Sequence, residues 1–64
     1  MMEINEFLKM WYNVKGTVRK IKLNNDDVIF ATDYVLLYNN VILKGHEWMI
    51  GRFKLSNIDI IECE

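Results

Sequence analysis

The spacing of apolar residues changes early in the chain, from a helical period to a period of two. The first apolar side chains recur at the i, i+3, i+4 and i+7 positions of one helical face: Ile4, Phe7, Leu8 and Trp11. Glu3 and Glu6 lie near the start of this segment and Lys9 lies near its end, as the helix dipole favours. The pattern predicts an amphipathic helix over about residues 2–12.

Alternation of apolar and polar residues predicts strands from about residue 14 onward. The segment VKGTVRKIKL changes phase between Val18 and Ile21, which indicates a bulge or bend near Arg19 and Lys20. The following NNDD is rich in turn-forming residues. The next apolar run, residues 28–32, predicts a short strand.

Residues 34–50, YVLLYNNVILKGHEWMI, predict two successive hairpins. Asparagine tolerates positive φ, so Asn39 and Asn40 are expected to form the first turn. Tyr38 would then lie opposite Val41, and the next pair away from the turn would be Leu37 with Ile42.

The second hairpin is expected to turn at Gly45–His46 and to continue as a strand to Leu55. In this register Lys44 lies opposite Glu47, an opposite-charge pair of the kind that stabilises antiparallel strands. The residues SN then interrupt the strand, and IDIIE, residues 58–62, predicts the last strand.

Together these elements predict a single α+β domain, mainly β, that spans residues 1–64. A helix over about residues 2–12 precedes a five-stranded antiparallel meander over about residues 14–62. Two arrangements fit this order of elements: an open meander with the helix on one face, or a small SH3-like or Sm-like barrel with the helix at one end.

The central strands present two apolar faces of different composition. One face is aliphatic and rich in methionine, as protein cores are, and carries Val35, Leu37, Ile42, Met49, Phe53 and Leu55. The other face contains aromatic types that are enriched at protein interfaces, and it carries Tyr34, Leu36, Tyr38, Val41, Leu43, Trp48 and Ile50.

One short helix can cover only one of these faces. An apolar patch of several hundred Å² is rarely left in water by a soluble monomer. The pattern therefore predicts a partner-binding surface made by six side chains of the aromatic face: Tyr34, Leu36, Tyr38, Leu43, Trp48 and Ile50. A closed barrel would instead bury these side chains, and the pattern leaves both arrangements open.

The length and the single cysteine limit what can stabilise the domain. A chain of 64 residues buries only about 60% of the surface that its unfolded form exposes. Cys63 has no second cysteine to pair with, which fits a reducing compartment and predicts a cytoplasmic protein. His46 is the only histidine, so neither a metal nor a cofactor is expected. Self-association or binding to another protein is the remaining source of stability.

Basic residues are concentrated in the first half of the chain. Residues 7–25 contain five basic residues and no acid, so the rest of the chain carries a net charge of −6. Cations near Trp11 and Tyr12 could bind single-stranded nucleic acid, and the candidates are Lys15, Arg19, Lys20 and Lys22. Against this, lysines on edge strands often block strand addition, and the pI of about 5.7 is low for a nucleic-acid-binding domain.

Two segments resemble known families. A helix followed by a short meander resembles the Sm-like fold, in which VLLYNN is similar to the central hairpin and FKLSNIDIIE to the last strand. That resemblance implies a ring with an RNA site. The pattern from Val18 to Glu62 is also similar to small phage and mobile-element proteins of low-GC Gram-positive bacteria, which implies a protein that inhibits or modulates a host protein.

The leading hypothesis is a non-enzymatic protein-binding module that inhibits or modulates a host protein, or that forms a homodimer. No second catalytic group accompanies His46, so catalytic residues and a small-molecule substrate are not expected. No apolar run approaches the roughly 18 residues of a membrane span, so a membrane is not expected as a partner either. The alternative is a small barrel that binds single-stranded nucleic acid through the basic strand.

Overall fold

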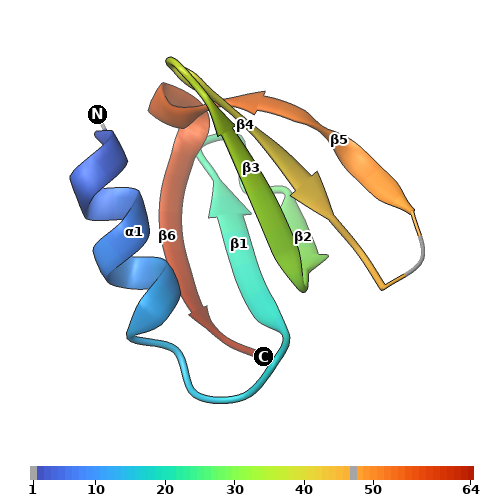
Figure 1. Ribbon diagram of the computed structural model, residues 1–64. Coiled ribbons are helices and arrows are strands. Elements are labelled where there is room, and N and C mark those ends of the chain that lie inside the picture. The colour runs from blue at the N-terminus through green and yellow to red at the C-terminus, as the bar shows by residue number, and fades with distance from the viewer. Residues whose placement is uncertain (1, 47) are drawn as a thin grey trace.

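The computed structural model describes residues 2–46 and 48–64, and it contains one helix and six strands. In chain order the elements are α1 (Ile4–Tyr12), β1 (Arg19–Leu23), β2 (Val28–Ala31), β3 (Asp33–Leu37), β4 (Asn40–Lys44), β5 (Met49–Lys54), the 3-10 helix η1 (Leu55–Asn57) and β6 (Ile58–Cys63). The prediction of an α+β, mainly β fold is confirmed (Figure 1).

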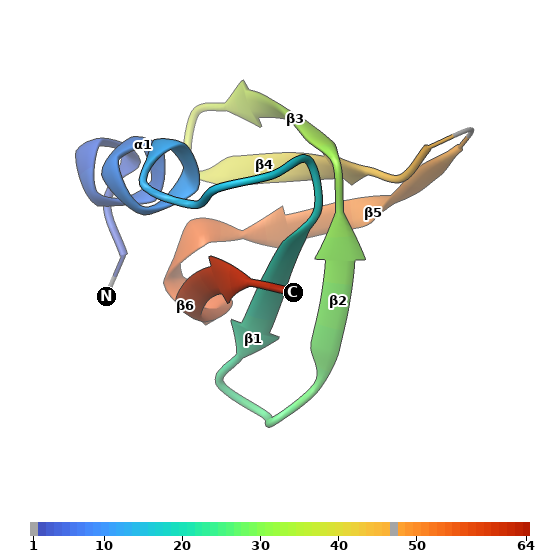
Figure 2. The same cartoon turned by 90° about the horizontal axis from the view of Figure 1, so that it is seen from below.

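The strands form two antiparallel three-stranded sheets, in the orders β2-β1-β6 and β3-β4-β5. The last strand returns to pair with β1, so the chain is not the simple five-stranded meander that was predicted. Within the part of the chain that the structure describes, no strand of one sheet pairs with a strand of the other. The closed barrel, one of the two arrangements that the sequence left open, is therefore wrong, and the two sheets instead pack across one another (Figure 2).

The boundary between the sheets lies at Thr32, where the chain bends sharply between β2 and β3 (Figure 2). The Thr32 N–H donates to the Lys44 carbonyl, with N and O 2.9 Å apart. Two residues later, the Tyr34 N–H donates to Oδ1 of Asp33 at 2.8 Å. These bonds give the backbone N–H groups at the bend hydrogen-bond partners. The chain can therefore leave the first sheet at the end of β2 and enter the second sheet with β3.

Most of the apolar face predicted for the helix α1 does pack against the core. Phe7 and Trp11 are buried and Leu8 packs against the core, whereas Ile4 is 40% exposed. The helix begins at Ile4, and Met2 before it is also buried in the core. Figure 1 shows α1 beside β6, so the helix covers one end of the space between the sheets.

Both sheets and the helix contribute to one hydrophobic core. Its buried side chains are Met2, Phe7, Trp11, Ile21, Leu23, Ala31, Val41, Leu43, Leu55, Ile58 and Ile61. Because this set includes alternate residues of β1 and β4, each sheet turns one face inward and one face outward.

The first hairpin turns one residue earlier than predicted. Leu37 pairs with Asn40, so the turn consists of Tyr38 and Asn39 rather than of the two asparagines. Tyr38 has a φ of 56°, a left-handed conformation that is uncommon for a bulky residue. The Asn39 carbonyl accepts the Leu55 N–H at 2.9 Å, which ties this turn to the start of η1. The shift leaves the same residues on each face of β3 and β4, because the pairing moves by an even number of positions.

The second hairpin differs more from the prediction. Leu43 pairs with Gly51 and Lys44 pairs with Met49, with an irregularity between Leu43 and Lys44. The Gly45 N–H donates to the Trp48 carbonyl at 2.8 Å, so a wider loop replaces the tight Gly45–His46 turn. The predicted pair between Lys44 and Glu47 lies outside the described residues.

The predicted core face of the central sheet is wrong. Val35, Leu37 and Met49 point outward, whereas Val41 and Leu43 of the opposite face are fully buried. The physical reason is that the other sheet and the helix both pack on the aromatic face rather than on the aliphatic one. The Tyr34 ring lies edge-on to Phe7 and Trp11 of α1, with centroids 5.1 and 4.8 Å away. Of the predicted core face, Phe53 and Leu55 do contact the core.

Candidate functional site

The six residues predicted to bind a partner do not form one exposed surface. Leu43 is fully buried, and the partly buried Tyr34, Leu36 and Ile50 pack against the core. Tyr38 is 82% exposed and Trp48 is 67% exposed. They lie at opposite ends of strand β4, one in the turn before it and one in the loop after it. The expectation of a contiguous exposed aromatic face is therefore wrong.

An aromatic cluster joins α1 to β3. The Tyr12 and Tyr34 hydroxyls form a hydrogen bond at 2.8 Å, and their rings lie edge to face at 6.3 Å. This hydrogen bond is the main cause that raises the pKa of Tyr34 from 10.0 to about 12, and burial adds to the shift.

The Tyr34 shift predicts a loss of stability at high pH. The folded protein holds the phenolic proton more tightly than the unfolded chain, so this stabilisation is complete below pH 10.0 and is lost as the pH rises through about 12. Tyr12→Phe removes the partner hydroxyl, so the pKa of Tyr34 should fall toward 10.0. Ultraviolet absorbance of tyrosinate measures this, and Tyr38→Phe in the exposed turn is the control. An unchanged Tyr34 titration in Tyr12→Phe would show that the hydroxyl pair is not the cause.

Arg19, one of the predicted nucleic-acid ligands, is held by the chain itself. Its Nε donates to the Trp11 carbonyl at 3.1 Å, and its Nη1 donates to the carbonyls of Gly16 at 3.1 Å and Thr17 at 3.3 Å. Its guanidinium carbon lies 4.8 Å from the centre of the Trp11 ring. Arg19 therefore caps the end of α1 and fixes the connection to β1.

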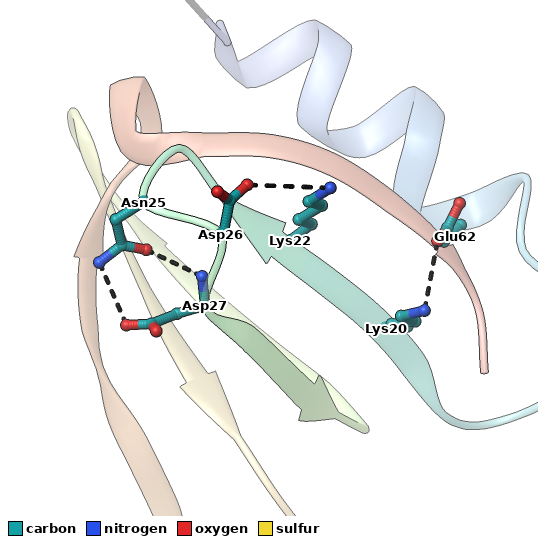
Figure 3. A network of polar contacts seen from close by, with 6 residues as sticks. All are labelled: Lys20, Lys22, Asn25, Asp26, Asp27 and Glu62. Carbon is teal, nitrogen blue, oxygen red and sulfur yellow. Dashed lines mark hydrogen bonds and ion pairs between the residues drawn. The ribbon is translucent and has the colours of Figure 1, made fainter.

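The two lysines of β1 form ion pairs at the surface. The Lys20 Nζ lies 3.7 Å from Oε1 of Glu62, and the Lys22 Nζ lies 3.9 Å from Oδ1 of Asp26 (Figure 3). Three of the four predicted nucleic-acid ligands thus already have partners within the chain, and the fourth, Lys15, is exposed in the connection between α1 and β1. The four side chains therefore do not form a continuous row of cations that are free to bind phosphate groups.

The outward face of the β3-β4-β5 sheet combines apolar and basic side chains, and we call it the basic–apolar face. Its apolar members are Val35, Leu37, Ile42 and Met49, and its cations are Lys44, Arg52 and Lys54. Asp33, at the end of β3, is its one acid among the described residues. Ile42 lies between Val35 and Arg52 in one row of the ladder, so apolar and basic groups are direct neighbours.

The outward face of the other sheet differs in charge. Val28, Phe30 and Ile60 are exposed there, and they flank the two lysines of the central strand. Both lysines are in the ion pairs described above, at or beside that face. Neither of the ion pairs found among the described residues involves Arg52 or Lys54. The basic–apolar face therefore offers the stronger combination of apolar surface and uncompensated positive charge.

The basic–apolar face was missed because its apolar residues were assigned to the core. A signal was present in MIGRFK, where Arg52 and Lys54 alternate with Phe53. Two cations at alternate positions mark an outward face. Their neighbours on β4 then share that face, which identifies Ile42 as an outward residue.

A shallow groove separates the start of α1 from the β3–β4 turn. It is lined by Glu3, Asn5, Asn39, Lys54 and Ser56, together with neighbouring apolar side chains. Across residues 2–46 and 48–64, no group of three or more histidine, cysteine or acidic side chains could hold a metal ion. None of the helical segments described has the length and apolar character needed to cross a membrane.

Comparison with known proteins gives no relative: no family model, no curated protein and no solved structure matches this chain.

Proposed function

We propose that this protein is a non-enzymatic protein-binding module and that its basic–apolar face contacts another protein. The observation that supports this is the outward position of Val35, Leu37, Ile42 and Met49 on three adjacent strands. A cluster of exposed aliphatic groups on a sheet face is typical of a surface that a partner covers. In line with the resemblance to phage and mobile-element proteins, the partner would be a host protein that this module inhibits or modulates.

The chemistry of the face favours binding rather than catalysis. Asp33 is its one acid among the described residues, and its other outward groups are apolar side chains, an amide and cations. A catalytic site would pair a nucleophile with a base or with an acid of suitable pKa. Val35 and Ile42 supply apolar area, while Arg52 and Lys54 supply charge at its border. Apolar groups at the centre with polar groups at the rim is the usual arrangement of a protein interface.

A matched pair of substitutions tests the proposal. Val35 is 38% exposed on β3 and Val28 is 43% exposed on β2, and each lies on a strand at the edge of its sheet. Val35→Glu places a charge on the basic–apolar face, whereas Val28→Glu places the same charge on the other sheet. We expect tagged Val35→Glu to lose the proteins that the wild type captures from the host, while Val28→Glu keeps them.

Circular dichroism of both variants separates lost binding from lost folding. The two melting transitions should differ little, because both sites are surface positions. Equal capture by the two variants would contradict the proposal. Capture of nucleic acid instead of protein, lost in Lys20→Glu and Lys22→Glu, would favour the basic-strand alternative.

A further inference from the structure

We infer that the partner covers the basic–apolar face with an acidic amphipathic helix, and that the partner is a different protein rather than a second copy. This inference rests on the proposed function and specifies the chemistry of the partner. It depends on the shape of the apolar cluster and on the distribution of charge around it.

The shape of the cluster favours a helix over an added strand. Its apolar side chains come from all three strands: Val35 and Leu37 from β3, Ile42 from β4 and Met49 from β5. A strand added at an edge of the sheet would contact the side chains of one strand only. A helix lying over the face presents a stripe of apolar side chains and covers neighbouring strands together.

The charges on the face require acids in the partner. Arg52 and Lys54 both lie on β5, so positive charge borders one side of the apolar cluster. Asp33 lies at the opposite edge, on β3. In the partner helix, glutamates on the side that faces β5 would pair with the two cations. A neutral or basic residue would be favoured where the helix lies close to Asp33.

The same charges disfavour a two-fold dimer through this face. In such a dimer the same patch meets itself. Among the described residues, each copy of the face carries three cations and one acid. Two surfaces of like net charge would therefore meet, whatever the direction of the two-fold axis, and like charges across an interface oppose association. A homodimer was one of the two predicted assemblies, and the charge distribution favours the other, a complex with a different protein.

Two synthetic peptides of equal length test the charge requirement. Both carry leucines at the i, i+3, i+4 and i+7 positions of one helical face, and one has glutamates where the other has lysines beside that face. Fluorescence anisotropy gives the affinity of each, and NMR of the labelled protein gives the location. We expect the glutamate peptide to bind at least about tenfold more tightly, about 1.4 kcal/mol, with shifts on β3, β4 and β5. The difference should shrink as salt rises.

Charge-reversed proteins provide the control. Arg52→Glu with Lys54→Glu should abolish or invert the preference for the glutamate peptide. Lys15→Glu with Lys22→Glu makes the same change in net charge at a distance from the face and should preserve the preference. Equal binding of both peptides, no binding of either, or shifts outside the β3-β4-β5 sheet would overturn the inference. If Val35→Glu still abolishes capture of the host protein in that case, the proposed function stands and only the acidic helix is wrong. If capture is also unchanged, both are wrong.

Discussion

Trp11→Ala should bring the protein close to unfolding, whereas Trp48→Ala should leave its stability nearly unchanged. Trp11 is only 3% exposed and packs against both Phe7 and Tyr34 in the core. Replacing a buried tryptophan by alanine typically costs about 3–5 kcal/mol. A domain of this kind has a total stability of only about 5 kcal/mol, at the low end of the usual range.

The comparison with Trp48 controls for the change in residue type. Trp48 is exposed in the loop between β4 and β5, where little burial is lost on truncation. Urea unfolding followed by circular dichroism measures both variants. Similar midpoints for Trp11→Ala and the wild type would show that α1 is peripheral to the core. A large loss in Trp48→Ala would show that this loop is part of the core.

Leu43→Ala should destabilise the protein by about 2–5 kcal/mol, while Leu37→Ala should change stability by less than about 0.5 kcal/mol. Leu43 is fully buried on the inward face of β4, and Leu37 is 40% exposed on the outward face of β3. The two substitutions remove the same atoms from opposite faces of one sheet. Their difference therefore reports directly which face is the core.

Denaturant midpoints of the two leucine variants check this assignment. A larger loss in Leu37→Ala than in Leu43→Ala would mean that the aliphatic face is the core and that the basic–apolar face is not available to a partner. Equal large losses would mean that the β3-β4-β5 sheet is buried on both faces, so that neither face is free to bind a partner.

Local patterns in the sequence predicted α1 and most of the strands. The strand expected from about residue 14 begins only at Arg19, and its irregularity lies between Lys22 and Leu23 rather than near Arg19 and Lys20. The helical spacing of Phe7 and Trp11 predicted α1, and turn-forming residues predicted the break between β1 and β2. At that break the Asn25 Oδ1 accepts the Asp27 N–H at 3.1 Å (Figure 3). These features depend on neighbours in the sequence, so the sequence alone indicates them.

The arrangement of the strands could not be predicted, because it depends on distant residues. The last strand, β6, returns to pair with β1, so Ile21 lies opposite Ile61, forty positions away in the sequence. No residue near either strand indicates this pairing. The bend at Thr32 is likewise stabilised by the distant Lys44 carbonyl. A run of alternating residues indicates a strand but not its neighbour.

The choice of the inward face also depends on a long-range contact. Both faces of β3 and β4 are apolar, so alternation alone does not decide between them. The contact of Tyr34 with Phe7 and Trp11 decides, because it brings α1 onto the aromatic face. The candidate binding surface is therefore the basic–apolar face and not the aromatic face that the sequence indicated.

The most direct test of the binding face is the affinity of the purified partner for Val35→Glu and Val28→Glu, measured side by side by calorimetry. We predict that Val35→Glu binds at least about tenfold more weakly than the wild type, a loss of about 1.4 kcal/mol, while Val28→Glu binds as the wild type does. Equal affinities for the two variants, or a loss confined to Val28→Glu, would contradict the assignment of the basic–apolar face as the partner-binding surface.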